Sequence, residues 1–251
     1  AVLGLGWDQE EPGYTASVEG MEPEKADNSK DNEELLKAAK WEASFTPEAF
    51  VKACADQGKL ITLGADSNLA IGQTGDGGRT VTLTVDGEEV NASELRIALG
   101  STEMRSTLLN EFEMRDGKVY MSGRGYGHGV GMSQVGANHL AKNEGFNYAQ
   151  ILAHYYYDGN AAIVTGDVYP EKITYAGSAY DTREYLAKAL ESEMGASFHI
   201  EALKAQAVAI YTFAKHYSYN LSSDAHSFTA GTPSAIVYEA VDAVMKDGLY
   251  V

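Results

Sequence analysis

The chain has 251 residues, a formal net charge of −17 at pH 7, 16 tyrosines and a single cysteine, Cys54. This length allows one large domain or two small ones, and the strong negative charge argues against a nucleic-acid partner because phosphates would be repelled. One cysteine excludes an internal disulfide, no apolar run is long enough to cross a membrane, and the opening AVLGLGW is too short for a signal peptide.

Helix and strand signals in the first half predict a small mixed region. Residues 8–40 are acidic and loosely patterned, so we expect surface strand and loop there. Thr46 as N-cap, followed by proline and glutamate, predicts a helix that continues through Ala53. Short strand-like segments and a second helix over ASELRIALG follow, which makes 46–100 a predicted α+β insert.

A hairpin is predicted next, because Arg115-Asp116-Gly117 separates two alternating runs. It leads into the segment GRGYGHGVGMSQVGA, residues 123–137, where glycine occupies every second position from 123 to 131. In an extended strand these glycines would leave one face bare, and the other face would carry Arg124, Tyr126 and His128, which suits a ligand with many hydroxyl groups. The alternative is a flexible glycine-rich loop. Ser133 is positioned to cap a helix that starts at Gln134.

The second half predicts helices separated by short strands. NYAQILAHYY has helical spacing and should stop at Asp158-Gly159, whereas DVYPEKITYAG is typical of turn and strand. Asp181 and Glu184 predict a capping box for a helix over Arg183–Met194, and a longer helix should run from about Ile200 to Tyr219. Turns and short strands are expected after it. This irregular order favours an α+β fold over a doubly wound sheet, and no internal repeat is evident.

Glu193 is the candidate catalytic residue. At roughly 100° per residue it lies about 20° from Leu186 and about 60° from Leu190, so it falls on the apolar face of its helix. It also lies in the last turn, where the helix dipole is negative. Both influences favour the protonated carboxyl group, which is what a general acid requires. The alternative is that the helix end frays and Glu193 points to water.

Polar residues on the following helix are weaker candidates. Lys204 shares a stripe with Val208 and Tyr211, and Gln206 lies on a flank, so a solvated helix face would also account for them. The six histidines form no pair at metal-ligand spacing, and His226 beside Asp224 is only a weak indication of a metal site.

Three segments together resemble the stage II sporulation protein D family, whose domain is also called SpoIID/LytB. They are GRGYGHGVGMSQVGA, YAQILAHYYYDG and REYLAKALESEMGASFHIEALKAQAVA, with weaker similarity elsewhere along most of the chain. The resemblance implies a lytic transglycosylase of peptidoglycan, which cuts between N-acetylmuramic acid and N-acetylglucosamine and leaves a 1,6-anhydro end. The acidic catalytic residue of the family falls on Glu193.

The same resemblance implies the other site residues. Lys204, Gln206, His128, Ser133 and Gln134 match positions that would line the glycan cleft. Arg124, Tyr126 and Tyr211 complete the expected substrate-binding set, although Tyr211 stands where the family usually has an arginine. Some members hold zinc with cysteine and histidine in the region of residues 224–238; this chain has no cysteine there, so we expect no metal and no cofactor.

Domain organisation and location follow from the resemblance. The two halves stand in reversed order relative to the family, and its Ser/Gly-rich connecting loop is absent. We expect residues 1–45 and 101–251 to form the catalytic domain around the 46–100 insert. Expected partners are peptidoglycan glycan strands, a cell-wall amidase and membrane-anchored engulfment proteins. The location would be extracytoplasmic, with an N-terminal membrane anchor outside this chain.

A second hypothesis is a non-catalytic glycan-binding or amidase-enhancing module, which the family also contains. Glu193 favours the enzyme, whereas Tyr211 and the missing loop favour the binding module.

Overall fold

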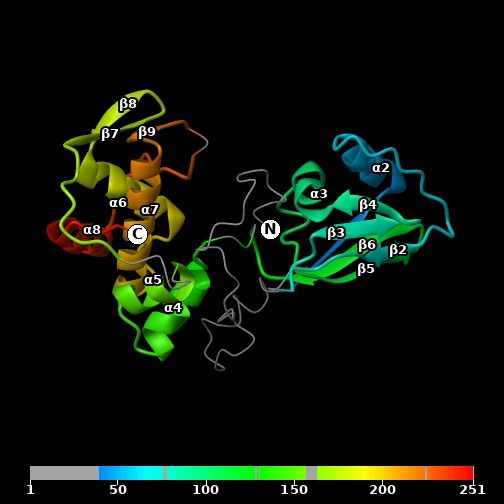
Figure 1. The fold of residues 1–251 in the computed structure, drawn as a ribbon, viewed down its shortest axis with the longest axis horizontal. Coiled ribbons are helices and arrows are strands. Elements are labelled where there is room, and N and C mark those ends of the chain that lie inside the picture. Colours follow the sequence, from blue (N-terminus) through cyan, green and yellow to red (C-terminus); the bar gives the residue numbers. More distant parts are fainter. Residues whose placement is uncertain are drawn as a thin grey trace. The chain divides into compact units, whose positions relative to one another are not determined.

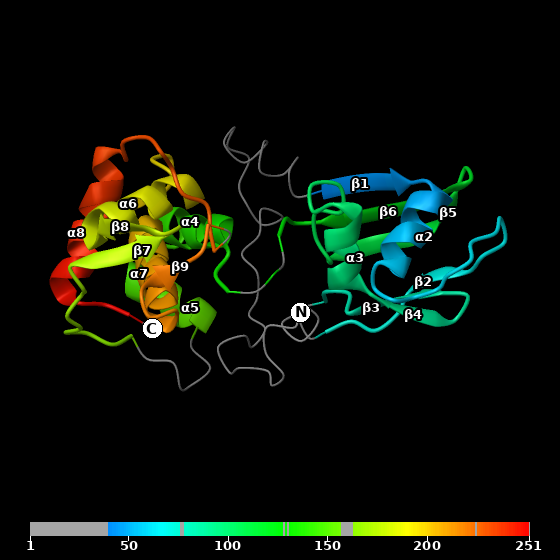
Figure 2. The same cartoon turned by 90° about the horizontal axis from the view of Figure 1, so that it is seen from above.

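The computed structural model describes residues 40–75, 78–127, 129, 131–156, 163–223 and 225–250. The chain divides into two compact units, residues 1–130 and 131–251, and each is described by itself. Figures 1 and 2 show that both units combine helices with small sheets. The predicted α+β class is therefore confirmed.

An antiparallel sheet of order β1-β6-β5 forms one part of the first unit. Its strands are β1 (Lys40–Phe45), β5 (Leu109–Arg115) and β6 (Lys118–Arg124). The β5–β6 hairpin turns through Asp116 and Gly117, whose φ angles are 51° and 72°. Two successive positive φ angles are the signature of the tight turn that suits a two-residue hairpin, so the predicted hairpin is confirmed.

A second antiparallel sheet and two helices complete this unit. The sheet has the order β2-β3-β4, with β2 at Leu69–Ile71, β3 at Thr82–Val85 and β4 at Glu88–Asn91. Helix α2 (Pro47–Ala55) begins as predicted, since Thr46 Oγ1 accepts a hydrogen bond from the Ala49 amide at 3.2 Å. Helix α3 (Ala92–Leu99) is capped by the side chain of Asn91.

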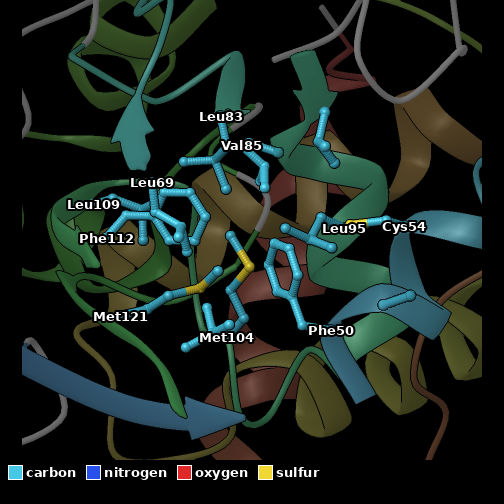
Figure 3. Close-up of a cluster of buried hydrophobic side chains, with 14 of the residues drawn as sticks. Phe50, Cys54, Leu69, Leu83, Val85, Leu95, Met104, Leu109, Phe112 and Met121 are labelled. Carbon is cyan, nitrogen blue, oxygen red and sulfur yellow. The ribbon is translucent and has the colours of Figure 1, made fainter. Parts of the chain in front are cut away.

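One apolar core holds the first unit together (Figure 3). Phe50 of α2, Leu83 of β3 and Leu95 of α3 are fully buried beside Met121 of β6. Burying a side chain of this size stabilises a fold by about 1.5–3 kcal/mol. The structure therefore groups residues 46–100 with β1, β5 and β6, and not as an insert apart from them.

The second unit is mainly helical. Helix α7 (Ile200–His216) packs against α4 (Gln134–Asn143), α5 (Tyr148–Tyr156), α6 (Thr182–Glu193) and α8 (Ala235–Asp247), and it is drawn in orange in Figure 1. A small sheet of order β8-β7-β9 lies beside them, with β7 at Lys172–Tyr175, β8 at Ser178–Asp181 and β9 at Asn220–Leu221. None of the helices in the described residues is long and apolar enough to cross a membrane.

Two predictions for this unit were wrong. Helix α7 ends at His216, short of Tyr219, because Ser218 and Tyr219 adopt φ angles of 52° and 60° that a helix does not allow. The C-terminal segment was predicted to form turns and strands, but it contains α8. Its valines occupy one face at helical spacing and are buried, and Gly248 ends the helix in the left-handed conformation.

The structure also contains a repeat that the sequence did not reveal. The succession β3, two-residue turn, β4 and α3 recurs as β7, β8 and α6 at a constant offset of 90 residues. Both turns have positive φ angles, at Asp86-Gly87 and Ala176-Gly177, and an Asn or Asp residue caps each helix. When the two copies are aligned at this offset, few residues are identical, so the repeat lies in the backbone geometry and not in the sequence.

Candidate functional site

Glu193 is the last residue of α6, and its half-buried carboxyl group is held by two donors. Its Oε2 accepts a hydrogen bond from Gln134 Nε2 at 3.0 Å, and its Oε1 accepts one from the backbone amide of Ser227 at 3.1 Å. Both oxygens are therefore engaged, which contradicts the alternative of a glutamate that simply points to water. The two bonds fix the orientation of the carboxyl group.

The sequence places Glu193 at this point because α6 has well-defined ends. Asp181 caps its start by accepting hydrogen bonds from the amides of Arg183 and Glu184, as predicted. Glu184 does not complete the predicted box with its side chain, which accepts a hydrogen bond from Tyr238. Gly195, with φ of 72°, terminates the last turn. Leu186 and Leu190 anchor the buried face beside which Glu193 lies.

Gln134 reaches Glu193 from the start of α4. Ser133 is the N-cap, as predicted, and its Oγ accepts a hydrogen bond from the Gly136 amide at 3.0 Å. Gln134 is thus the first helical residue, and its side-chain amide donates to the carboxyl group of Glu193. Glu193 itself lies at the negative end of α6. Of the candidates on the segment at residues 123–137, Gln134 contacts Glu193 directly.

The segment between β9 and α8 supplies the second donor and is fastened to α6 at several points. Glu191 Oε2 accepts hydrogen bonds from both the amide and the hydroxyl of Ser234, at 2.8 and 2.7 Å. Lys188 Nζ donates to the carbonyl oxygen of Gly231 at 2.9 Å. These contacts hold the segment against the helix, so that the amide of Ser227 faces Glu193. This donor has no side-chain signature in the sequence, because it belongs to the backbone.

Lys204 takes part in a contact between helices α7 and α5. Its Nζ lies 2.7 Å from Glu201 Oε1, and the other oxygen of Glu201 accepts the amide of Tyr148, the first residue of α5. Burial alone would raise the pKa of Glu201, but the Lys204 ammonium and the Tyr148 amide outweigh it and lower that pKa. Gln206 is half-buried on the same helix.

Tyr211 was predicted to bind substrate, and the structure places it elsewhere. Its ring is fully buried and stacks on Tyr169 at 3.6 Å, while its hydroxyl donates to Asp167 Oδ2 at 2.6 Å. Lys215 donates to the same oxygen at 2.6 Å. Burial, together with the hydrogen bond to Asp167, raises the pKa of Tyr211 far above its ordinary value. A side chain enclosed in this way supports the fold and cannot line a glycan cleft.

Beyond Arg124, where β6 ends, the described residues of the glycine-rich segment do not form the extended strand that we predicted. Gly125, Gly127, Gly129 and Gly131 have φ angles of 74°, 90°, 76° and 78°, a conformation that glycine adopts without strain. The glycines are therefore needed for the path of the backbone. The expected close approach occurs at Gly123, where an added Cβ would lie 2.5 Å from the Trp41 ring, and at Gly129, where it would collide with the Arg79 side chain.

The remaining substrate-binding candidates lie on this segment in the first unit. Arg124 ends β6 and is exposed, and Tyr126 is 62% exposed. His128 lies outside the described residues. Glu193 and its two hydrogen-bond donors all belong to the second unit.

Comparison with known proteins identifies the stretch that contains Glu193. Residues 173–248 match the family model SpoIID, described as "Stage II sporulation protein". This stretch belongs to the SpoIID family. The match includes α6, α7 and α8, and therefore also the segment that supplies the Ser227 amide.

Curated relatives match similar lengths. The chain is 45% identical over 67 residues to the amidase enhancer of Bacillus subtilis (strain 168), which covers 27% of this chain and 9% of that protein. It is 35% identical over 80 residues to stage II sporulation protein D of Bacillus amyloliquefaciens, which covers 32% of this chain and 22% of the relative. For the Bacillus subtilis (strain 168) protein of the same name the values are 34% over 94 residues, 36% and 26%. The chain therefore spans about a quarter of these relatives or less.

A metal centre has no support in the described residues, where no group of three or more His, Cys, Asp or Glu side chains could hold an ion. His226, the one histidine that hinted at metal, is held by other groups. Its Nε2 lies 2.6 Å from the Tyr185 hydroxyl, and its Nδ1 lies 2.8 Å from the Ser227 carbonyl oxygen. Asp224 lies outside the described residues.

Proposed function

We propose that the chain is a peptidoglycan lytic transglycosylase in which Glu193 is the catalytic acid and base. The observation that supports this most strongly is the pair of hydrogen bonds that fix Glu193 at the end of α6. The two donors come from separate segments of the chain. Glu193 and Ser227 lie in the stretch that matches the SpoIID family model, and Gln134 lies in the glycine-rich segment that resembles the same family.

The chemistry needs only one carboxyl group. Protonated Glu193 donates its proton to the oxygen of the bond between N-acetylmuramic acid and N-acetylglucosamine, and the bond to the anomeric carbon breaks as an oxocarbenium-like transition state develops. The resulting carboxylate then accepts the proton of the C6 hydroxyl of the muramic acid residue. The C6 oxygen bonds to the anomeric carbon, which closes the 1,6-anhydro ring and restores the protonated acid. No water is consumed.

The neighbouring polar residues would serve the glycan strand. Gln134 orients the acid, and Gln206 and Lys204 are candidates for contacts with sugar hydroxyl groups or the muramic acid side chain. We also propose an extracytoplasmic location, since the polymer lies outside the cytoplasm. Arg124, Tyr126 and His128 remain proposed substrate contacts.

A second candidate function is a non-catalytic module that binds glycan or enhances an amidase. The 45% identity to a protein named amidase enhancer favours it. In that case the engaged carboxylate of Glu193 would be a binding group for sugar hydroxyls, and no glycosidic bond would break.

One experiment separates the two candidates. Purified protein is incubated with glycan strands stripped of their stem peptides, and soluble products are separated by chromatography and weighed by mass spectrometry. If the chain is the enzyme, anhydro products should appear with the wild-type protein and disappear with Glu193→Gln. They should persist with Glu239→Gln, which is a matched control because Glu239 is exposed on α8. The binding module predicts co-sedimentation without products, and stimulation of a cell-wall amidase by the wild-type protein.

A further inference from the structure

We propose that Tyr185, His226 and Tyr175 form a positioning clamp that fixes the peptide bond between His226 and Ser227, so that this peptide holds Glu193 in its reactive orientation. The inference rests on the proposed function of Glu193 as the acid. None of the three side chains touches the reacting atoms in this scheme; they act through the peptide.

The clamp begins with the peptide itself. Its N–H group, from Ser227, donates to Glu193 Oε1 at 3.1 Å. Its carbonyl group, from His226, accepts a hydrogen bond from the Tyr175 hydroxyl at 2.9 Å. Because the N–H and C=O groups of one peptide bond are coplanar and point in opposite directions, a hydrogen bond at each end fixes the rotation of the plane.

The imidazole of His226 secures the next peptide. Its Nδ1 faces the Ser227 carbonyl oxygen at 2.8 Å, and a carbonyl oxygen only accepts, so Nδ1 carries the proton. Nε2 of the neutral ring is then an acceptor, and the Tyr185 hydroxyl at 2.6 Å is its donor. Both backbone polar groups of Ser227 are thereby fixed, the N–H by Glu193 and the C=O by His226.

The two tyrosines give the clamp a rigid base. Tyr185 is fully buried on α6, and burial raises the pKa of its phenol well above the ordinary value, so the hydroxyl keeps its proton and remains a donor. Tyr175 lies on β7, and its hydroxyl is 2.9 Å from the carbonyl oxygens of both His226 and Ser223, so these two acceptors share its single proton. Its ring stacks on those of His226 and Phe228, at 5.1 and 4.4 Å.

This arrangement is more than local packing, because it connects the start of α6 to its end. Tyr185 lies two turns before Glu193 on the same helix, and His226 and Ser227 complete a loop from one to the other. A displacement of about 1 Å at a reacting group can reduce catalysis by about a hundredfold. Loss of the clamp should therefore reduce kcat by between tenfold and a hundredfold, on that same scale, and leave KM almost unchanged.

The first test requires no activity. In amide-resolved NMR of the whole chain, the Ser227 amide proton should resonate at low field in the wild-type protein, and move upfield in Glu193→Gln, Tyr185→Phe and His226→Ala. Tyr169→Phe is the matched control, since it removes a tyrosine hydroxyl that donates to the backbone carbonyl of Leu249 in the same unit. It should leave the Ser227 resonance in place.

The second test is kinetic, with glycan strands as substrate. Tyr185→Phe and His226→Ala should lower kcat with little change in KM, and His226→Asn, which keeps a donor near the Nδ1 position, should recover part of the loss. Tyr169→Phe should retain the wild-type kcat. Thermal unfolding of each variant verifies that the unit remains folded.

The outcomes distinguish this inference from the proposed function. If the wild-type protein releases anhydro products and Tyr185→Phe changes neither kcat nor the Ser227 resonance, the clamp is refuted while the function stands. If no variant or wild-type protein releases product but the Ser227 resonance still depends on Tyr185 and His226, the function is refuted and the positioning of Glu193 stands.

Discussion

Removing the side chain of Gln134 tests how much the observed hydrogen bond contributes to the action of Glu193. In Gln134→Ala the bond of 3.0 Å to Oε2 is lost, and nothing in the shorter side chain replaces it. A hydrogen bond to a charged group contributes about 1.5–3 kcal/mol. Each loss of about 1.4 kcal/mol of transition-state stabilisation lowers kcat tenfold. If the whole energy of this hydrogen bond acts in the transition state, Gln134→Ala should lower kcat by about tenfold to 150-fold.

The assay is the initial rate of anhydro product release at saturating glycan, with thermal unfolding as the check on folding. Gln134 is the first residue of α4, where alanine is well tolerated, so the unfolding temperature should hardly change. Gln134→Glu is a second probe, because two carboxyl groups at this distance would share a proton and carry activity to higher pH. If Gln134→Ala retains the wild-type kcat in an active protein, the hydrogen bond does not support catalysis and the reasoning fails.

Three further predictions concern the fold. Ala176 adopts a φ of 50° in the β7–β8 turn, where Asn or Asp is preferred, so Ala176→Asn should raise the free energy of unfolding by about 0.5–1 kcal/mol in urea titrations; a decrease would contradict the assigned turn. Gly123→Ala should destabilise the first unit by about 1–3 kcal/mol, because its Cβ would collide with the Trp41 ring, and wild-type stability would show that the ring is elsewhere. The hydrogen bonds from Lys215 and Tyr211 lower the pKa of Asp167 below its ordinary value. A lowered carboxyl pKa stabilises the fold above the unfolded value of about 3.9, and this stabilisation is lost as the pH falls through the folded value. Asp167→Asn should therefore weaken the acid dependence of stability below about pH 4, and an unchanged profile would exclude this source.

Local signals allowed several elements to be predicted from the sequence. Thr46, Ser133 and Asp181 each cap a helix as expected, because a short polar side chain just before an amphipathic run can accept a hydrogen bond from a free amide of the first turn. The Asp116-Gly117 hairpin is a similarly local matter of turn geometry. Helix α8 was missed because its isoleucine and valines favour strands in isolation, and only packing against α6 and α7 determines the outcome.

Part of the candidate site could be predicted, from helix periodicity and from the resemblance to SpoIID. The position of Glu193 on its helix indicated a partly buried acid, and the resemblance to SpoIID pointed to Gln134. The second donor could not be predicted, since the Ser227 amide has no side-chain signature and reaches Glu193 only through tertiary contacts. Tyr211 was misassigned because it was placed in the cleft from its match to an arginine position of the family, and this match does not reveal that the tyrosine packs against Tyr169.

The central claim is that Glu193 drives an intramolecular ring closure, and cleavage in heavy-oxygen water tests it most directly. Glycan strands are digested by wild-type protein in this solvent, and the new muramic acid ends are weighed. The account predicts ends without the heavy isotope, each lighter than a hydrolysed end by one water, and none at all from Glu193→Gln. Ends that carry the heavy oxygen, or anhydro ends that persist in Glu193→Gln, would contradict it.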